Sequence, residues 1–171
     1  PDRAAETDSY PSVLGRWTRE TKLYRGFDAQ LSVRATLKTW DFQQAMVREY
    51  AGRYRLTAAE RDLLYEKERV RTRNFFDFIV VVHTPELRRN DLDAKTSAWR
   101  MRLKVNDVDP PQEPIRLVPA GKDPVVEIFF PIHSAFSRTY VASFARATGE
   151  IRNVRLTIAG PEGATTLAWS N

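Results

Sequence analysis

The chain has only two histidines, His83 and His133, and no cysteine. A catalytic histidine needs a nucleophile and an orienting acid within reach, and the sequence has no G-x-S-x-G motif that would supply the nucleophile. The two histidines also lack the H-x-x-x-H spacing of a zinc site. His83 ends an apolar run that is followed by Thr84 and Pro85, so we expect it to be the last residue of a strand. The sequence therefore predicts no catalytic residue and no cofactor.

The phrase Asn-Asp-x-Asp occurs twice and offers oxygen atoms to calcium, which takes about six to eight of them. The acids are Asp91 and Asp93 in the first copy and Asp107 and Asp109 in the second. The copies flank a predicted strand, whose length of roughly 23 Å keeps them from sharing one ion. Asn and Asp are also common turn formers. We therefore expect turns at both copies and no metal site.

Basic residues are concentrated in the stretch 41–73, which holds eight bases and six acids, a net charge of +2. Such mixed charge is typical of solvated helix faces with ion pairs between successive turns. A nucleic-acid-binding protein would show a denser basic stripe or an aromatic RNA-binding motif, so no nucleic acid is expected. The face that could meet a partner protein or an anionic membrane surface is carried by five arginines: Arg48, Arg53, Arg55, Arg61 and Arg69.

The chain has four tryptophans, Trp17, Trp40, Trp99 and Trp169. A surface row of tryptophans could bind sugars or a partner. Trp99 lies on the apolar side of its predicted strand, however, so core packing is the favoured interpretation.

Two kinds of hydrophobic pattern position these residues. Apolar and polar residues alternate over 29–37, which predicts a strand with one buried face. From Asp41 the period becomes that of an amphipathic helix, and Thr57 with Glu60 forms a capping box that begins a second helix. Residues 40–73 are thus predicted to form a helical hairpin. Its apolar stripe should pack on an edge or face of the sheets through Phe42, Met46, Leu56 and Leu63.

Strand patterns return after the hairpin and continue to the end of the chain. The predicted strands cover 75–83, 99–105, 114–118, 125–131, 140–146 and, as a β-hairpin, 154–169. This arrangement predicts a mostly β chain with a helical insertion, in the form of an immunoglobulin-like β-sandwich of about seven to eight strands plus a two-helix hairpin. The sandwich should bury Phe78, Val80, Leu103 and Phe129 in one core. The polar start predicts a flexible leader over 1–15 ahead of a single domain over 16–171.

Several layout features lie between residues 24 and 146. They are the Phe-rich strand "FFDFIVVVHTPE", an Asn-Asp-Leu turn, a strand led by Trp99, a short strand preceded by proline, and then Phe-Pro and Tyr-x-x-x-Phe. In this layout the chain resembles the mature domain of uncharacterised bacterial envelope lipoproteins. The resemblance implies an exported protein, periplasmic or anchored in the outer membrane, and it assigns no functional residue. The first residue is Pro1 rather than Met, which agrees either with removal of a signal peptide or with a chain that was shortened at its start.

These observations favour a non-enzymatic cell-envelope protein that acts as an interaction or assembly module. Its partner would be another envelope protein or the membrane surface. The alternative is a β-sandwich domain that binds a small molecule or a carbohydrate, and a hydrolase is the third interpretation.

Overall fold

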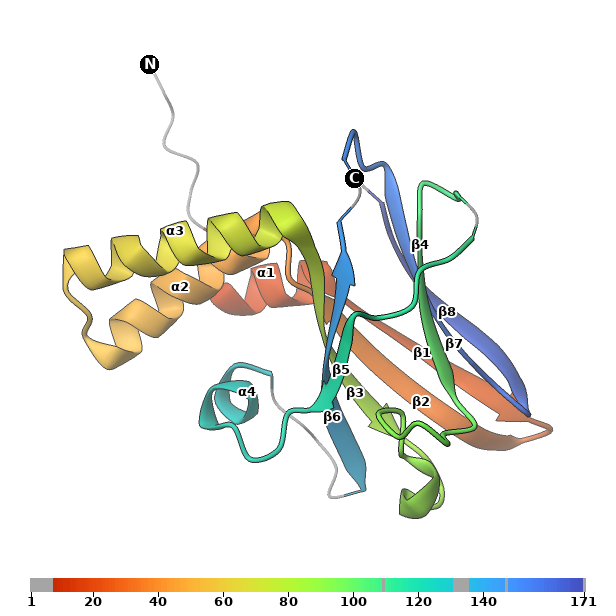
Figure 1. The fold of residues 1–171 in the computed structure, drawn as a ribbon. Coiled ribbons are helices and arrows are strands. Elements are labelled where there is room, and N and C mark those ends of the chain that lie inside the picture. Colours follow the sequence, from red (N-terminus) through yellow and green to blue (C-terminus); the bar gives the residue numbers. More distant parts are fainter. Residues whose placement is uncertain (1–7, 109, 131–135, 147, 171) are drawn as a thin grey trace.

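The structure is a computed structural model that describes residues 8–108, 110–130, 136–146 and 148–170. Its strands are β1 (Thr18–Arg25), β2 (Asp28–Leu37), β3 (Phe75–His83), β4 (Arg100–Val105), β5 (Arg116–Pro119), β6 (Ser137–Ala145), β7 (Asn153–Gly160) and β8 (Gly163–Ser170). They form two antiparallel sheets, a five-stranded sheet of order β1-β2-β3-β6-β5 and a three-stranded sheet of order β4-β7-β8 (Figure 1). The prediction of a mostly β chain with a helical insertion is confirmed.

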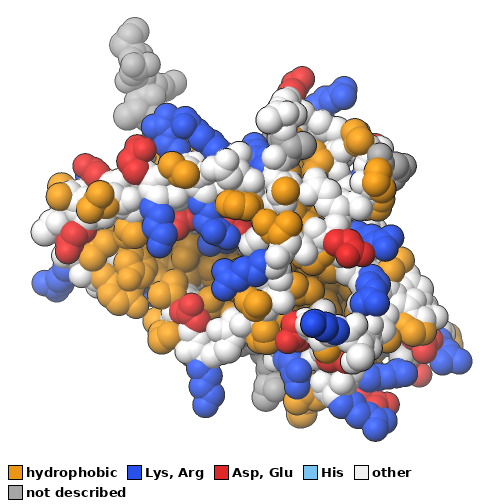
Figure 2. Space-filling model, in the orientation of Figure 1, with side chains coloured by type: hydrophobic (Ala, Val, Ile, Leu, Met, Phe, Trp, Pro, Cys, Tyr) orange, Lys and Arg blue, Asp and Glu red, His pale blue; other side chains and the backbone are white. Residues whose placement is uncertain are grey.

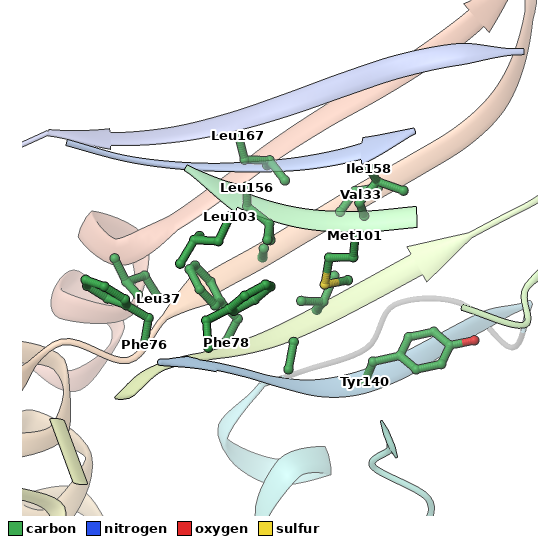
Figure 3. Close-up of a cluster of buried hydrophobic side chains, with 14 of the residues drawn as sticks. Val33, Leu37, Phe76, Phe78, Met101, Leu103, Tyr140, Leu156, Ile158 and Leu167 are labelled. Carbon is green, nitrogen blue, oxygen red and sulfur yellow. The ribbon is translucent and has the colours of Figure 1, made fainter. Parts of the chain in front are cut away.

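The main core lies between the two sheets, where inward-facing side chains of both sheets meet (Figure 3). In β2, Leu31 and Val33 are fully buried, whereas Ser32 between them is partly exposed. This period of two is the one that predicted the strand. Phe78, Val80 and Leu103 are completely buried in this core, as predicted.

The predicted helical hairpin consists of α2 (Trp40–Tyr54) and α3 (Ala58–Asn74), which extend away from the sheets (Figure 1). Thr39 caps α2 by accepting a hydrogen bond from the backbone N–H of Phe42. Thr57 and Glu60 form the predicted capping box of α3. Helix α3 runs directly into β3, so the hairpin is joined to the sheet without a loop at this end.

Two further helices, α1 (Tyr10–Trp17) and α4 (Pro124–Phe129), flank the hairpin, and a 3₁₀ turn covers Leu87–Arg89. Side chains of α1, α2 and α4 form a second apolar cluster with Ile79 of β3. In Figure 2, hydrophobic side chains gather in this region, below α3 and on the side of α4. The described residues include no helix that is both long enough and apolar enough to cross a membrane.

The predicted strand at 125–131 is wrong, because residues 124–129 form helix α4. Asp123 accepts a hydrogen bond from the N–H of Val125, and Pro124 supplies a backbone angle suited to the first helical turn. Val126 and Phe129 then lie three residues apart and are both buried in the second cluster. Phe129 is therefore buried, but outside the sandwich core in which it was expected.

The predicted leader over 1–15 is too long, since α1 begins at Tyr10. Tyr10 and Val13 are buried, and the Tyr10 hydroxyl donates a 2.7 Å hydrogen bond to the carbonyl oxygen of Phe129. Burial of this hydroxyl raises the pKa of Tyr10 above its ordinary value. Packing against residues far along the chain therefore orders residues 10–15 of the predicted leader.

The predicted packing face of α3 is also wrong. Leu63 and Val70 are exposed, with 72% and 55% of their surface accessible. The inward face carries Tyr65, which meets Trp40 edge to face, and Thr72, which is buried. Polar contacts hold this face to the sheet, so Leu63 and Val70 of α3 point to solvent.

In α2 the prediction of the packing face is better, because Phe42 is fully buried and Met46 packs on the second cluster. Leu56, between the two helices, is partly buried.

Candidate functional site: a tryptophan pocket beside an arginine groove

Three of the four tryptophans line one pocket at the helix end of the sheets. Trp17 ends α1, Trp40 begins α2, and Trp169 lies near the end of β8. We call this site the tryptophan pocket. It has a volume of about 230 Å³, and its aromatic lining is Trp17, Trp40, Phe75, Phe76 and Trp169.

Hydrogen bonds and ring contacts fix the three indoles. Trp17 Nε1 donates to Asp41 Oδ2 at 2.7 Å, and Trp169 Nε1 donates to the carbonyl oxygen of Trp17 at 2.8 Å. The ring of Trp40 meets Tyr65 edge to face with a centroid distance of 6.3 Å. Trp169 is buried and forms the floor, whereas Trp17 and Trp40 are partly exposed. The pocket thus presents aromatic surface that is already ordered.

The charged residues of the pocket lining are mainly basic. Lys38, Arg146 and Arg152 line it together with a single acid, Asp41. The Asp41 carboxylate is already engaged, because it accepts from Arg16 Nη1 at 3.0 Å as well as from Trp17. Burial lowers the pKa of the Lys38 amino group, and the nearby carboxylates of Glu68 and Asp77 oppose this shift.

An adjoining groove of about 810 Å³ runs between α3 and the segment after β6. We call it the arginine groove, and its lining includes Arg69, Arg73, Arg146, Gln44 and Trp40. No acidic residue is among the described residues that line it. Trp40 and Arg146 belong to both linings, so the groove and the pocket adjoin at these two side chains. Figure 2 shows Lys and Arg side chains around α3 near the sheet.

Three contacts hold Arg146 at the junction. Its Nη1 donates to the carbonyl oxygen of Thr72 at 2.6 Å, and its guanidinium carbon lies 5.0 Å from the centroid of the Phe76 ring. Its backbone N–H donates to the carbonyl oxygen of Asn74 at 3.0 Å. The guanidinium is therefore ordered before any ligand binds.

A buried ionic cluster lies beneath this site and fastens α3 to the sheet. Asp77 of β3, only 3% exposed, accepts hydrogen bonds from Arg71 and from the hydroxyl of Ser143. Its hydrogen bonds raise the pKa of the Arg71 guanidinium. Gln43 of α2 donates to Glu68 of α3, which joins the two helices. Asp77 thus lies within the apolar strand β3 because it binds Arg71 of the preceding helix α3.

The five arginines predicted to form a partner face are all exposed, and the structure gives them different surroundings. Arg53 pairs with Glu49 and its guanidinium lies 5.2 Å from the ring centroid of Phe129. Arg61 pairs with Asp62, and Arg69 pairs with Glu66 and lines the arginine groove. Arg48 and Arg55 complete the set on α2 and at its C-cap. Only Arg69 belongs to the site described above.

The Asn-Asp-x-Asp phrases form turns. Asn90 is buried and donates to the carbonyl oxygen of Val82, and Asp91 accepts from Ser97. Asp93 is exposed. In the second phrase, Asn106 has a left-handed backbone with φ of 52°. Its side chain accepts from the backbone of Arg152 and Asn153, while Asp107 pairs with Arg155. Asp109 lies outside the described residues.

Of the two histidines, His83 is among the described residues. His83 ends β3, as predicted, and its Nδ1 is buried without a hydrogen-bond partner among the described residues. His133 lies outside the described residues. Among the residues that are described, no group of three or more His, Asp or Glu side chains could hold a metal ion.

Trp99, the one tryptophan that does not line the pocket, packs in the main core, and its Nε1 donates to the carbonyl oxygen of Arg89. A Cβ atom at Gly160 would lie 2.5 Å from Trp99 Cε3, so the close contact of this ring requires glycine there.

The sequence did not identify Lys38, Arg73, Arg146 and Arg152 as members of a site. One feature could have pointed to the site. Three of the tryptophans, Trp17, Trp40 and Trp169, lie at or next to the end of a helix or strand. Comparison with known proteins adds no relative: no family model matches the sequence, and no curated protein or solved structure matches it significantly.

Proposed function

We propose that the protein is a non-enzymatic binding module of the cell envelope that holds a saccharide or similar small molecule in the tryptophan pocket. The observation that carries this proposal is the convergence of Trp17, Trp40 and Trp169 on one pocket from distant parts of the chain. Indole rings present flat apolar surface, which suits the apolar faces of sugar rings. The N–H groups of Trp17 and Trp169 are engaged within the protein, so ligand hydroxyl groups would be bound by the polar residues of the lining. The envelope location rests on the layout-level resemblance.

The size of the pocket limits the ligand. Drug-sized ligands occupy pockets of roughly 300–1,000 Å³, and the tryptophan pocket, at about 230 Å³, is smaller. One ring fits the pocket, and a longer ligand would continue into the arginine groove, which is contiguous with it. Asn153 also lines the pocket, and its Oδ1 is buried without a hydrogen-bond partner among the described residues, so a rotation of this side chain would offer a ligand hydroxyl an acceptor.

The immunoglobulin-like form of the sandwich remains part of the proposal. Eight antiparallel strands in two sheets around one core support it. In this frame the binding site lies at one end of the sandwich, where the loops and helix ends meet.

Replacing Trp40 with alanine is expected to weaken saccharide binding by about fivefold to 150-fold, because stacking of a flat ring on one aromatic side chain contributes about 1–3 kcal/mol for nucleic-acid bases. Isothermal titration against a panel of neutral and acidic oligosaccharides would first identify the saccharides that bind. The Trp40→Ala protein would then be titrated with them.

The matched control is Phe27→Ala. Phe27 is fully exposed in the turn between β1 and β2, and the ten residues of β2 place it roughly 30 Å from the pocket. This control should bind as the unaltered protein does. Saccharide binding that is equally strong in Trp40→Ala and in the unaltered protein would contradict a ligand site at the tryptophan pocket.

A second candidate function is an interaction module that docks on an anionic membrane surface through the helical hairpin. The specific observation is the exposed apolar pair Leu63 and Val70 on α3, accompanied by exposed Tyr54 at the end of α2 and by several arginines. Helices that lie in a membrane interface combine apolar side chains with basic ones in this way.

Charge reversal at Arg53 and Arg55 is expected to weaken binding to vesicles that contain phosphatidylglycerol. The binding that the variant retains should fall further when the salt concentration is raised. Arg69 is left unchanged because it lines the arginine groove. Thermal stability should fall only modestly, because both side chains are exposed, although Arg53 loses its pair with Glu49 and its contact with the Phe129 ring. Vesicle cosedimentation measures the effect, with phosphatidylcholine vesicles as the uncharged control. Undiminished cosedimentation of the variant with anionic vesicles would leave the hairpin as a cover for the sheet, or as a site for a protein partner.

A further inference from the structure

We infer that the ligand is an acidic saccharide, with its ring in the tryptophan pocket and its oxyanion group in the arginine groove. This inference rests on the proposed function, because it names the ligand class of the same site. It adds a second set of residues, Arg73 and Arg146, whose role is to bind the negative charge.

The charge of the combined lining supports this assignment. The pocket and the groove together are lined by five basic residues and one acid, which are Lys38, Arg69, Arg73, Arg146, Arg152 and Asp41. The acid is already bound to Arg16. Guanidinium groups bind carboxylate and phosphate oxygens through paired N–H donors, and Arg is the preferred residue where such recognition is needed.

The two helical arginines of the groove are placed to share one anion. Arg69 and Arg73 are four residues apart on α3, so their side chains are neighbours and like charges there repel. Arg69 has a distant and exposed partner, Glu66, at 3.6 Å. Arg73 has no ion pair with any described residue, in contrast to Arg71 between them, which is bound to Asp77. An oxyanion between Arg69 and Arg73 would relieve the repulsion.

Arg146 connects the charged and aromatic parts. It belongs to both linings, and Thr72 and Phe76 already fix its guanidinium. A side chain that is ordered before binding loses less conformational entropy when the ligand arrives. One of its N–H groups donates to Thr72, and among the described residues no other side-chain hydrogen bond of Arg146 engages the remaining ones, which are placed to bind an oxyanion.

Arginines in the last turn of a helix also stabilise the helix without any ligand, because the carbonyl end of the helix carries partial negative charge. Arg73 fits that role as well. Arg146 does not, because it follows β6 and lies outside the helix. Variants of both Arg73 and Arg146 are therefore needed to separate ligand binding from stabilisation of the helix.

The test compares the binding of three probes, namely trigalacturonate, its uncharged counterpart trigalactose and inorganic phosphate, by isothermal titration. Arg73→Gln and Arg146→Gln are each expected to weaken trigalacturonate binding by about tenfold or more, with little change for trigalactose. Binding of trigalacturonate to the unaltered protein should fall as salt rises, and less steeply so in the variants. Arg25→Gln, at the far end of β1 and 74% exposed in its side chain, is the control and should bind as the unaltered protein does.

Each result separates this inference from the proposed function. Equal binding of both trisaccharides, unaffected by Arg73→Gln and Arg146→Gln but reduced by Trp40→Ala, would overturn the acidic class and keep the saccharide site. Phosphate that binds as tightly as trigalacturonate would also overturn it, because the sugar ring would then contribute nothing. Absence of binding by both trisaccharides would overturn this inference, and failure of the whole oligosaccharide panel would overturn the proposed function with it. Arg73→Gln alters an exposed side chain, so this variant should remain folded if Arg146→Gln does not.

Discussion

Replacement of Phe78 with alanine is expected to lower the free energy of unfolding by about 3–5 kcal/mol. Phe78 is completely buried in the centre of the main core (Figure 3). Its ring meets that of Phe144 edge to face at 5.8 Å and lies 5.4 Å from that of Trp169. The variant would leave a cavity between two sheets whose ladders cannot move together to close it. Denaturant unfolding followed by circular dichroism would measure the change.

Phe27→Ala removes the same side chain from an exposed turn and serves as the control. Phe27 has no burial to lose, so its variant should unfold within about 0.5 kcal/mol of the unaltered protein. The Phe78 variant should also perturb the tryptophan pocket, because Trp169 is the floor of that pocket. If Phe78→Ala melted within a degree or two of the unaltered protein, the two sheets would not share the core described here.

Strands with one solvent-exposed face were predicted well from the sequence. In β2 the buried and partly exposed residues alternate. Leu31, Val33 and Ala35 therefore lie on the same, buried face of this strand, which pairs with β1 and β3. The hairpin helices were also predictable, because the capping box at Thr57 and Glu60 is a local signal. Both patterns are set by neighbours within a few residues.

Continuous apolar runs were harder to assign. The run at 125–130 lacks alternation, so its period does not distinguish a buried strand from a buried helix. Asp123 and Pro124 were the local signal for a helix, as a cap and a first-turn proline. Helix α1 carried a similar local signal that the prediction of a leader missed, because Ser9 precedes the helix, a proline stands in its first turn, and Tyr10, Val13, Leu14 and Trp17 follow helical spacing. Contacts of Tyr10 with Phe42 and Phe129 then hold the helix to distant segments.

The site itself depends on topology and was beyond local patterns. Trp17 and Trp169 are 152 residues apart, yet one donates a hydrogen bond to the other. Antiparallel pairing brings the end of β2 to the start of β3 in one sheet and the end of β8 to the start of β7 in the other. The packing of the two sheets on each other then brings Trp17 and Trp169 together. Arg146 gave no sign of its role in the sequence, because it reads only as the last residue of a predicted strand.

The buried acid Asp77 is the second position at which we expect a large effect. Asp77→Ala should lower the free energy of unfolding by about 3 kcal/mol, because it leaves the Arg71 guanidinium without its partner and Ser143 without its acceptor. This is the low end of the range for broken buried ion pairs. The side chain of Arg71 is 35% exposed and water screens part of its charge. Unfolding in urea measures the change.

The double variant Arg71→Ala/Asp77→Ala tests the cause of this destabilisation. Removing both partners leaves no unpaired charge, so the double variant should be more stable than the sum of the two single effects predicts. Asp62→Ala, which breaks an exposed pair with Arg61, is the matched control and should change stability by less than about 1 kcal/mol. Because Asp77 fastens α3 to β3, the single variant should also loosen the wall of the arginine groove and weaken trigalacturonate binding. Strict additivity of the two single variants would show that Arg71 and Asp77 do not stabilise the fold as a pair, and the hairpin would then be held to the sheet by its remaining contacts alone.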